Sequence, residues 1–171
     1  MKAESITLRT VVPSILLDTI AVLFILLLPS ISHLAGFPLY VIDPMRLVLF
    51  SAIIFTNKRN SYLIALLLPF VSFIISAHPY FYKVFLISTE LLLNVWLFYT
   101  ISGRFKNLFI STLASILISK VVYYLLKFAF ISFLLINDTL VSTSILIQIG
   151  VAIFISTLIF FVPTKKSKTK R

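Results

Sequence analysis

The chain has 171 residues, which favours one compact unit over two large domains. Hydrophobic residues make up 60% of it and charged residues only 12%, whereas about a quarter of the residues in a soluble domain are charged. This composition excludes an ordinary soluble domain and a disordered chain. It predicts an all-α, polytopic membrane protein. The chain contains no cysteine and only two histidines, so thiolate chemistry is excluded and a metal site is not expected.

Six apolar stretches predict six transmembrane helices, because each crossing needs about 20 apolar residues. The first stretch ends before Gly36, and the second begins with Asp43 as the helix cap and Pro44 at the first helical position. Pro163 ends the last stretch, so residues 1–163 form one six-helix domain and residues 164–171 a basic tail. The helices are expected at about 11–34, 44–57, 61–76, 80–101, 105–133 and 140–162.

The placement of basic residues predicts the orientation. With six spans, both termini and two of the loops lie on the same side, and that side holds 11 of the 15 basic residues. The three loops on the opposite side, at about 33–43, 77–79 and 134–139, hold none. Because basic loops stay in the cytoplasm, both termini are expected to be cytoplasmic. The basic tail is interpreted as an orientation signal that also attracts anionic lipid, and not as a nucleic-acid site.

Four basic residues fall within the predicted spans or at their outer ends. A charge at membrane depth costs a few kcal/mol, so each of these residues requires a partner or a wet cavity. The acidic partners available are Asp18, Asp43, Glu90 and Asp138. The four basic residues are Arg46, Lys83, Lys120 and Lys127.

Spacing along two helices predicts one specific ion pair. Lys83, Glu90 and Asn94 lie on one helical face, since they are separated by seven and four residues. Lys120 and Lys127 share a face of the next helix, beside Tyr123 and Tyr124. If the two helices are antiparallel neighbours, Lys120 lies level with Glu90 near the membrane midplane.

An outer cavity would then contain Lys83 and Lys127 together with Arg46, His78 and the tyrosines. Such a cavity suits a small anionic or carboxylate-bearing ligand with a flat ring. Structural explanations remain open for each group. The Glu90–Lys120 pair can be purely structural, Lys83 can extend to the interface, Arg46 can pair with Asp43, and His78 can be a turn residue. The candidate binding residues are Arg46, His78, Lys83, Glu90, Asn94, Lys120, Tyr124 and Lys127.

Sequence motifs of enzymes are missing. The chain has no P-loop, no G-x-S-x-G, no H-E-x-x-H and no pair of intramembrane aspartates. No catalytic residue, cofactor or metal ligand is therefore predicted, and the chain is not expected to be an enzyme.

The region from Pro44 to about Phe130 resembles the substrate-binding S components of energy-coupling factor (ECF) vitamin transporters. The resemblance covers about half of the chain. It rests on the sequences Pro44-Met45-Arg46, Ala65-Leu66-Leu67-Leu68-Pro69, His78-Pro79 and Glu90-Leu91-Leu92-Leu93-Asn94, together with the overall size and the six spans.

The resemblance implies a protein of a bacterial or archaeal cell membrane that binds a vitamin or similar micronutrient. The pocket would open to the outside, under the loop at 33–43. It also implies a transmembrane T component and two cytosolic ATPase subunits as partners, which would explain the missing ATP chemistry. The alternative is a structural membrane scaffold in cell-envelope or cell-shape assembly, similar to MreD.

Overall fold

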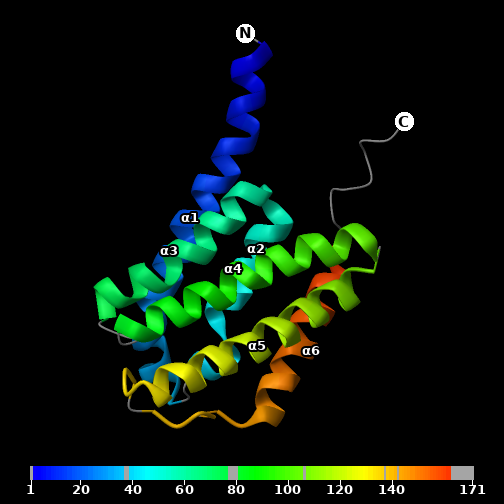
Figure 1. The fold of residues 1–171 in the computed structure, drawn as a ribbon. Helices are drawn as coiled ribbons and strands as arrows, with labels where there is room; N and C mark the ends of the chain where they lie inside the picture. The colour runs from blue at the N-terminus through cyan, green and yellow to red at the C-terminus, as the bar shows by residue number, and fades with distance from the viewer. Residues whose placement is uncertain are drawn as a thin grey trace.

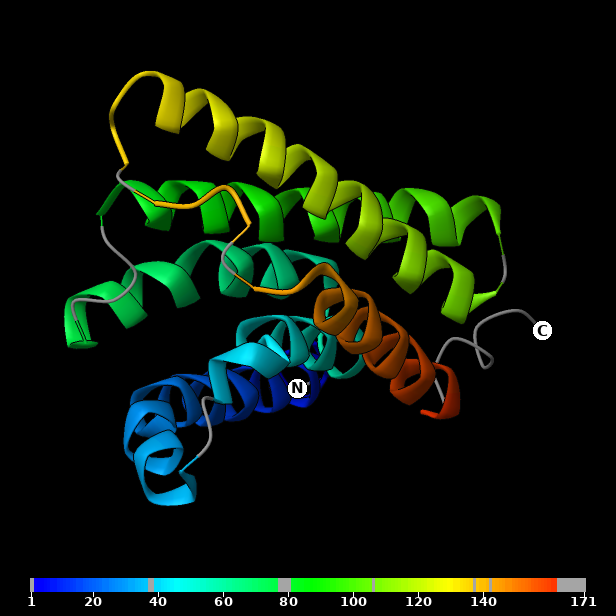
Figure 2. The same cartoon turned by 90° about the horizontal axis from the view of Figure 1, so that it is seen from below.

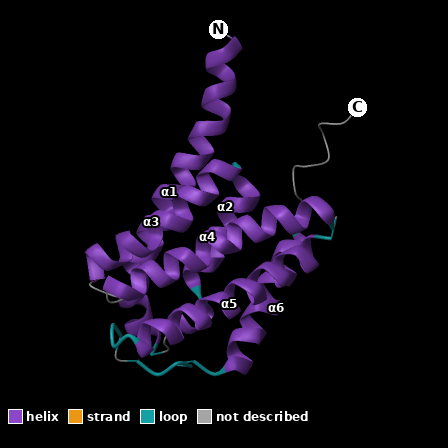
Figure 3. Ribbon diagram, viewed as in Figure 1, coloured by secondary structure: helices purple, strands orange, loops and turns teal. Residues whose placement is uncertain are grey.

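The computed structural model describes residues 2–36, 39–76, 81–105, 107–136, 138–141 and 143–162. The elements in this part of the chain are six α-helices and one short 3-10 helix, and none is a strand (Figure 3). They are α1 (Lys2–Ala35), η1 (Leu39–Ile42), α2 (Pro44–Phe55), α3 (Lys58–Ser76), α4 (Phe81–Arg104), α5 (Leu108–Ser132) and α6 (Ile145–Phe161). The all-α prediction is confirmed.

The helices form layers in which α3 lies between α1 and α4, and α4 lies between α3 and α5 (Figure 2). The N-terminal part of α1 extends beyond the other helices (Figure 1). Helix α2 has 12 residues, about 18 Å at 1.5 Å per residue, and it contacts α1, α3, α4 and α6. This short helix is therefore held inside the bundle by its neighbours.

The apolar core is centred on α2. Leu49, Phe50 and Ala52 are at most 1% exposed, and the Phe50 ring packs edge-on against Phe98 of α4 at 5.7 Å between centroids. On α5, three serines at four-residue spacing have no exposed surface. Small side chains at this spacing let neighbouring helices approach closely. These serines are Ser111, Ser115 and Ser119.

Three helical segments of the described chain are long and apolar enough to cross a membrane, namely Ser14–Ala35, Phe81–Arg104 and Leu108–Ser132. Helices α2 and α6 are apolar but shorter. Large apolar side chains lie on the outside of the bundle, such as Ile74, which is 78% exposed, and Leu146, which is 81% exposed. These features indicate a membrane protein.

Several helix boundaries differ from the prediction, among them the starts of α1, α5 and α6. Helix α1 begins at Lys2 instead of about residue 11, because the N-terminal stretch has good helix formers and no glycine or proline. Helix α5 begins at Leu108 because the Asn107 side chain caps it, accepting hydrogen bonds from the amides of Phe109 and Ile110 at 3.0 and 3.3 Å. Helix α6 begins at Ile145, after a stretch rich in serine and threonine. Such side chains compete with helical hydrogen bonds.

Candidate ligand-binding site

A cavity of about 590 Å³ lies inside the bundle and is bordered by residues of all six α-helices. Its volume falls within the range of about 300–1,000 Å³ that is usual for small-molecule sites. The lining residues are Ile25, Leu28, Pro29, Val41, Asp43, Pro44, Met45, Arg46, Ser72, Lys83, Ile87, Glu90, Lys120, Tyr123, Tyr124, Thr143, Gln148 and Val151.

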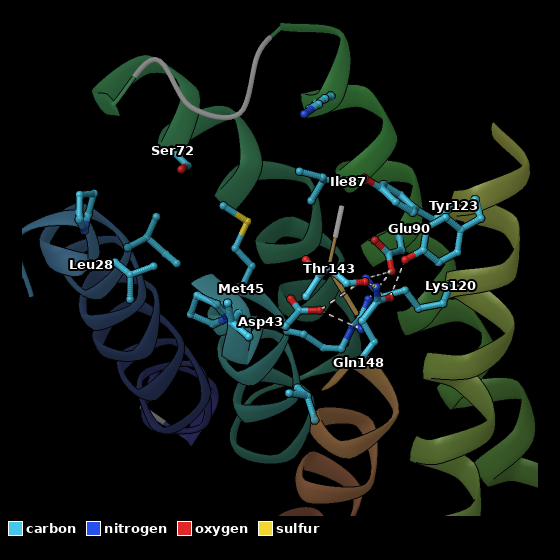
Figure 4. A pocket seen from close by; sticks show the side chains of 18 residues that line it. Leu28, Asp43, Met45, Ser72, Ile87, Glu90, Lys120, Tyr123, Thr143 and Gln148 are labelled. Carbon is cyan, nitrogen blue, oxygen red and sulfur yellow. Dashed lines mark hydrogen bonds and ion pairs between the residues drawn. The ribbon is translucent and has the colours of Figure 1, made fainter. Parts of the chain in front are cut away.

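The two sides of the cavity differ in chemistry. Leu28 of α1 and Met45 of α2 lie on one side, where the wall is apolar (Figure 4). Glu90, Lys120 and Tyr123 lie on the side of α4 and α5 (Figure 4). The cavity therefore offers an apolar surface opposite a charged and aromatic one.

Four charged residues from three elements meet on the charged side, and we refer to them as the Glu90 cluster: Asp43, Arg46, Glu90 and Lys120. The Arg46 guanidinium contacts the Glu90 carboxylate and lies 2.9 Å from Asp43 Oδ2. Lys120 Nζ lies 3.2 Å from Glu90 Oε1 and 3.9 Å from Asp43 Oδ2. Only 3% of the Arg46 side chain and 5% of the Glu90 side chain are exposed. The two carboxylates balance the two cations within the bundle.

The backbone at the start of α2 positions two members of this cluster. Asp43 precedes Pro44 and has left-handed dihedral angles, φ 55° and ψ 60°, a conformation that aspartate adopts more readily than most residues. Its side chain makes no capping hydrogen bond. It contacts Arg46 one turn later instead. The strained residue thus directs a carboxylate to the cavity, and the predicted capping role is replaced by ion pairing.

A second group of charges, the Asp138 cluster, joins α4 and α5 to the segment before α6. Asp138 Oδ2 lies 2.7 Å from Lys83 Nζ and 3.0 Å from Lys127 Nζ. Burial acts to raise the pKa of Asp138, but the contacts with these two ammonium groups and their charges outweigh burial and lower the pKa to about 2. A single carboxylate therefore forms ion pairs with two ammonium groups.

A hydrogen-bonded pair connects α5 to α6 at the edge of the cavity. The Tyr124 hydroxyl donates to Gln148 Oε1 at 2.7 Å, and Gln148 Nε2 donates to the Thr143 carbonyl at 2.8 Å. The Lys120 ammonium lies over the neighbouring Tyr123 ring, 5.3 Å from its centroid. These contacts hold both tyrosine rings beside the charged side of the cavity.

The structure brings together five of the eight predicted binding residues, since Arg46, Lys83, Glu90, Lys120 and Tyr124 all line the cavity. The predicted Glu90–Lys120 pair is confirmed, and Arg46 contacts Asp43, which was the structural alternative left open for it.

The other three residues differ in their placement. Asn94 has no exposed surface, Lys127 is 1% exposed, and neither lines the cavity. Lys127 was expected to face the cavity, but it is buried against Asp138 because its helical face packs inside the bundle. His78 lies outside the described residues.

Asp43, Asp138 and Gln148 were missed as site residues. Asp43 and Asp138 are the acids of two loops predicted on the outer side, where the basic groups of the spans also lie. Because the chain has only five acidic residues, each acid of an outer loop was a candidate partner for these basic groups, and this signal was available in the sequence. Asp18, which was considered as a partner of the basic groups, accepts a hydrogen bond from the Asn60 side-chain amide at 2.8 Å.

The site holds no cluster of metal-ligand type, since no three His, Cys, Asp or Glu side chains gather in the described part of the chain. Comparison of the chain with protein-family models, with curated proteins and with solved structures gives no match. The function is therefore inferred from the cavity and its charges.

Proposed function

We propose that this protein is the substrate-binding S component of an ECF importer, which takes up a vitamin or related micronutrient across a bacterial or archaeal cell membrane. The observation that carries the proposal is the cavity of about 590 Å³ with its buried charges. Buried charges are costly in a membrane bundle, and such residues usually mark a substrate or ion pathway. A scaffold needs neither the cavity nor the charges.

The position of the cavity also supports import. In a six-span arrangement with both termini in the cytoplasm, the cavity-lining residues of the helices fall in the outer half, as Leu28 near the end of α1 and Lys83 near the start of α4 illustrate, and Lys120 lies at the midpoint of α5. Val41 of η1 also borders the cavity, so the segment between α1 and α2, predicted on the outer side, contributes to its wall. A ligand would therefore arrive from outside.

The proposed role is binding, with energy supplied by partner subunits. The cavity presents ion pairs, two tyrosines and a glutamine, and these groups suit recognition and orientation of a ligand. A T component and two cytosolic ATPases would convert binding into uptake.

Native mass spectrometry of the protein, purified gently from its host membranes, tests this proposal. We expect a bound small molecule and an associated T component with ATPases. Envelope-assembly proteins in the spectrum, without either of these, would overturn the proposal in favour of the MreD-like scaffold.

A pair of variants shows whether a bound molecule occupies this cavity. Ile87→Trp fills the cavity from the wall of α4 and is expected to abolish the ligand signal. Phe85→Trp is the matched control, because Phe85 is 45% exposed on the outside of the same helix and does not line the cavity. Equal retention of the ligand by both variants would place it elsewhere.

A further inference from the structure

The two charged clusters together carry one more positive than negative charge. The Glu90 cluster is balanced, with two carboxylates and two cations. The Asp138 cluster has one carboxylate for two ammonium groups. The excess charge therefore belongs to the Asp138 cluster.

The chain has no further acidic side chain to balance this charge. Its five acidic residues include the three in the clusters. Asp18 accepts a hydrogen bond from Asn60 and borders a separate cavity of about 90 Å³. Glu4 lies near the start of α1, 21 residues before the cavity-lining Ile25, which corresponds to roughly 30 Å of helix. Among the acidic side chains that the structure describes, none is left to balance this charge, and an anion from outside the chain would do so.

The excess charge reaches the cavity through Lys83. Both lysines contact Asp138, but Lys127 is 1% exposed and does not line the cavity, whereas 20% of the Lys83 side chain is exposed and Lys83 does line it. An anion in the cavity would therefore meet the excess charge at Lys83.

The remaining surface of the cavity determines what uncharged part of such a ligand it can accommodate. Leu28, Met45 and Val151 supply apolar walls, and the rings of Tyr123 and Tyr124 lie beside the charged side. A flat ring packs favourably against such aromatic faces. A second charge on the ligand would find no excess cation to balance it.

We propose that the cavity takes a monoanion, a flat and largely apolar molecule with one carboxylate that lies against Lys83. This inference rests on the proposed binding function and specifies its substrate class. A neutral ligand leaves the excess positive charge buried, a cation adds to it, and a dianion replaces it with an excess negative charge. Burial of an unbalanced charge is unfavourable in each of these cases.

Calorimetric titration of the detergent-purified protein with three probes tests the inference. The probes are naphthoate, its neutral carboxamide and naphthalene dicarboxylate, which share one ring system and differ in charge. A hydrogen bond to a charged group contributes about 1.5–3 kcal/mol, so naphthoate is expected to bind wild-type protein roughly 10- to 100-fold more tightly than the carboxamide. It should also bind more tightly than the dicarboxylate.

Variants then shift the preference in opposite directions. Lys83→Gln removes the excess charge, so the preference for naphthoate over the carboxamide should disappear. Asp138→Asn raises the excess by one, so the dicarboxylate should become the tightest probe. Lys58→Gln is the control, because Lys58 lies over the Tyr99 ring and does not line the cavity. If Asp138→Asn does not fold, the Lys83→Gln result decides.

The inference is overturned if wild-type protein binds none of the probes, if it binds them equally, or if Lys83→Gln keeps the preference for naphthoate. None of these results would contradict the importer proposal, which is tested separately by copurification of the T component and ATPases. Copurified phosphatidylglycerol that is lost from Lys83→Gln would assign the anion to a lipid headgroup and overturn the carboxylate assignment.

Discussion

The Arg46 guanidinium of α2 contacts the Glu90 carboxylate of α4, and both side chains are almost completely buried. Lys120 approaches the same carboxylate oxygen from α5 at 3.2 Å. Glu90 thus joins three helices through one carboxylate group. Removal of one partner from a buried pair leaves an uncompensated charge, which costs more than the intact pair contributes.

Glu90→Gln is therefore expected to destabilise the protein by about 3–5 kcal/mol, because Arg46 and Lys120 would retain only Asp43. The measurement is denaturant or thermal unfolding in detergent. Arg59→Gln, which removes an exposed charge, is the control and should change stability little. In the double variant Glu90→Gln with Lys120→Met, part of the loss should be recovered. Unchanged stability in Glu90→Gln would show that the pairing contributes nothing.

The low pKa of Asp138 predicts a pH dependence of stability. The pKa falls from its usual 3.8 to about 2 in the folded protein, so the unfolded chain binds a proton more readily. The stabilisation, roughly 2 kcal/mol, is fully present above about pH 4 and is lost as the pH falls towards 2. Melting temperatures of wild type and Asp138→Asn should therefore converge over this interval. Parallel curves for the two proteins would contradict the assignment.

Asn94 allows the effect of a buried polar group on stability to be tested separately from ligand binding. Within the described part of the chain, neither polar atom of its side chain has a hydrogen-bond partner, and the residue has no exposed surface. Since an unsatisfied buried polar group costs about 1–3 kcal/mol, Asn94→Leu, which keeps the branched shape of the side chain, is expected to raise the melting temperature. Ligand binding should be unchanged because Asn94 does not line the cavity. A lower melting temperature would mean that Asn94 has an unrecognised partner, such as a bound water.

The proposed topology can be tested with single cysteines, since the chain has none. Thr139 is exposed in the segment before α6, and a Cβ added at Gly103 would meet nothing within 4 Å. With both termini in the cytoplasm, Thr139→Cys should react with an impermeant maleimide on intact cells. Gly103→Cys should react only after the membrane is permeabilised. The reverse pattern, or labelling of both on intact cells, would exclude this orientation.

Local sequence was sufficient to predict much of the fold. Long apolar stretches predict helices because the membrane leaves no other partner for backbone groups, and α2 through α4 lie close to their predicted ranges. The Arg46–Asp43 contact follows from a spacing of three residues on one helix turn. The Glu90–Lys120 pair followed from helix faces and antiparallel packing alone.

Only the tertiary structure decided which side chains share a carboxylate. Arg46 and Glu90 are 44 residues apart, and their contact depends on how α2 is rotated against α4. The same holds for Asp138, which meets lysines of two helices, and for the burial of Lys127 and Asn94. Helical periodicity defines a face within one helix, but the rotation and register between helices depend on side-chain packing across the whole bundle. The sequence alone therefore determined the positions of the helices and showed that acidic residues are few. The packing of the helices determined the cavity and the placement of the excess charge beside it.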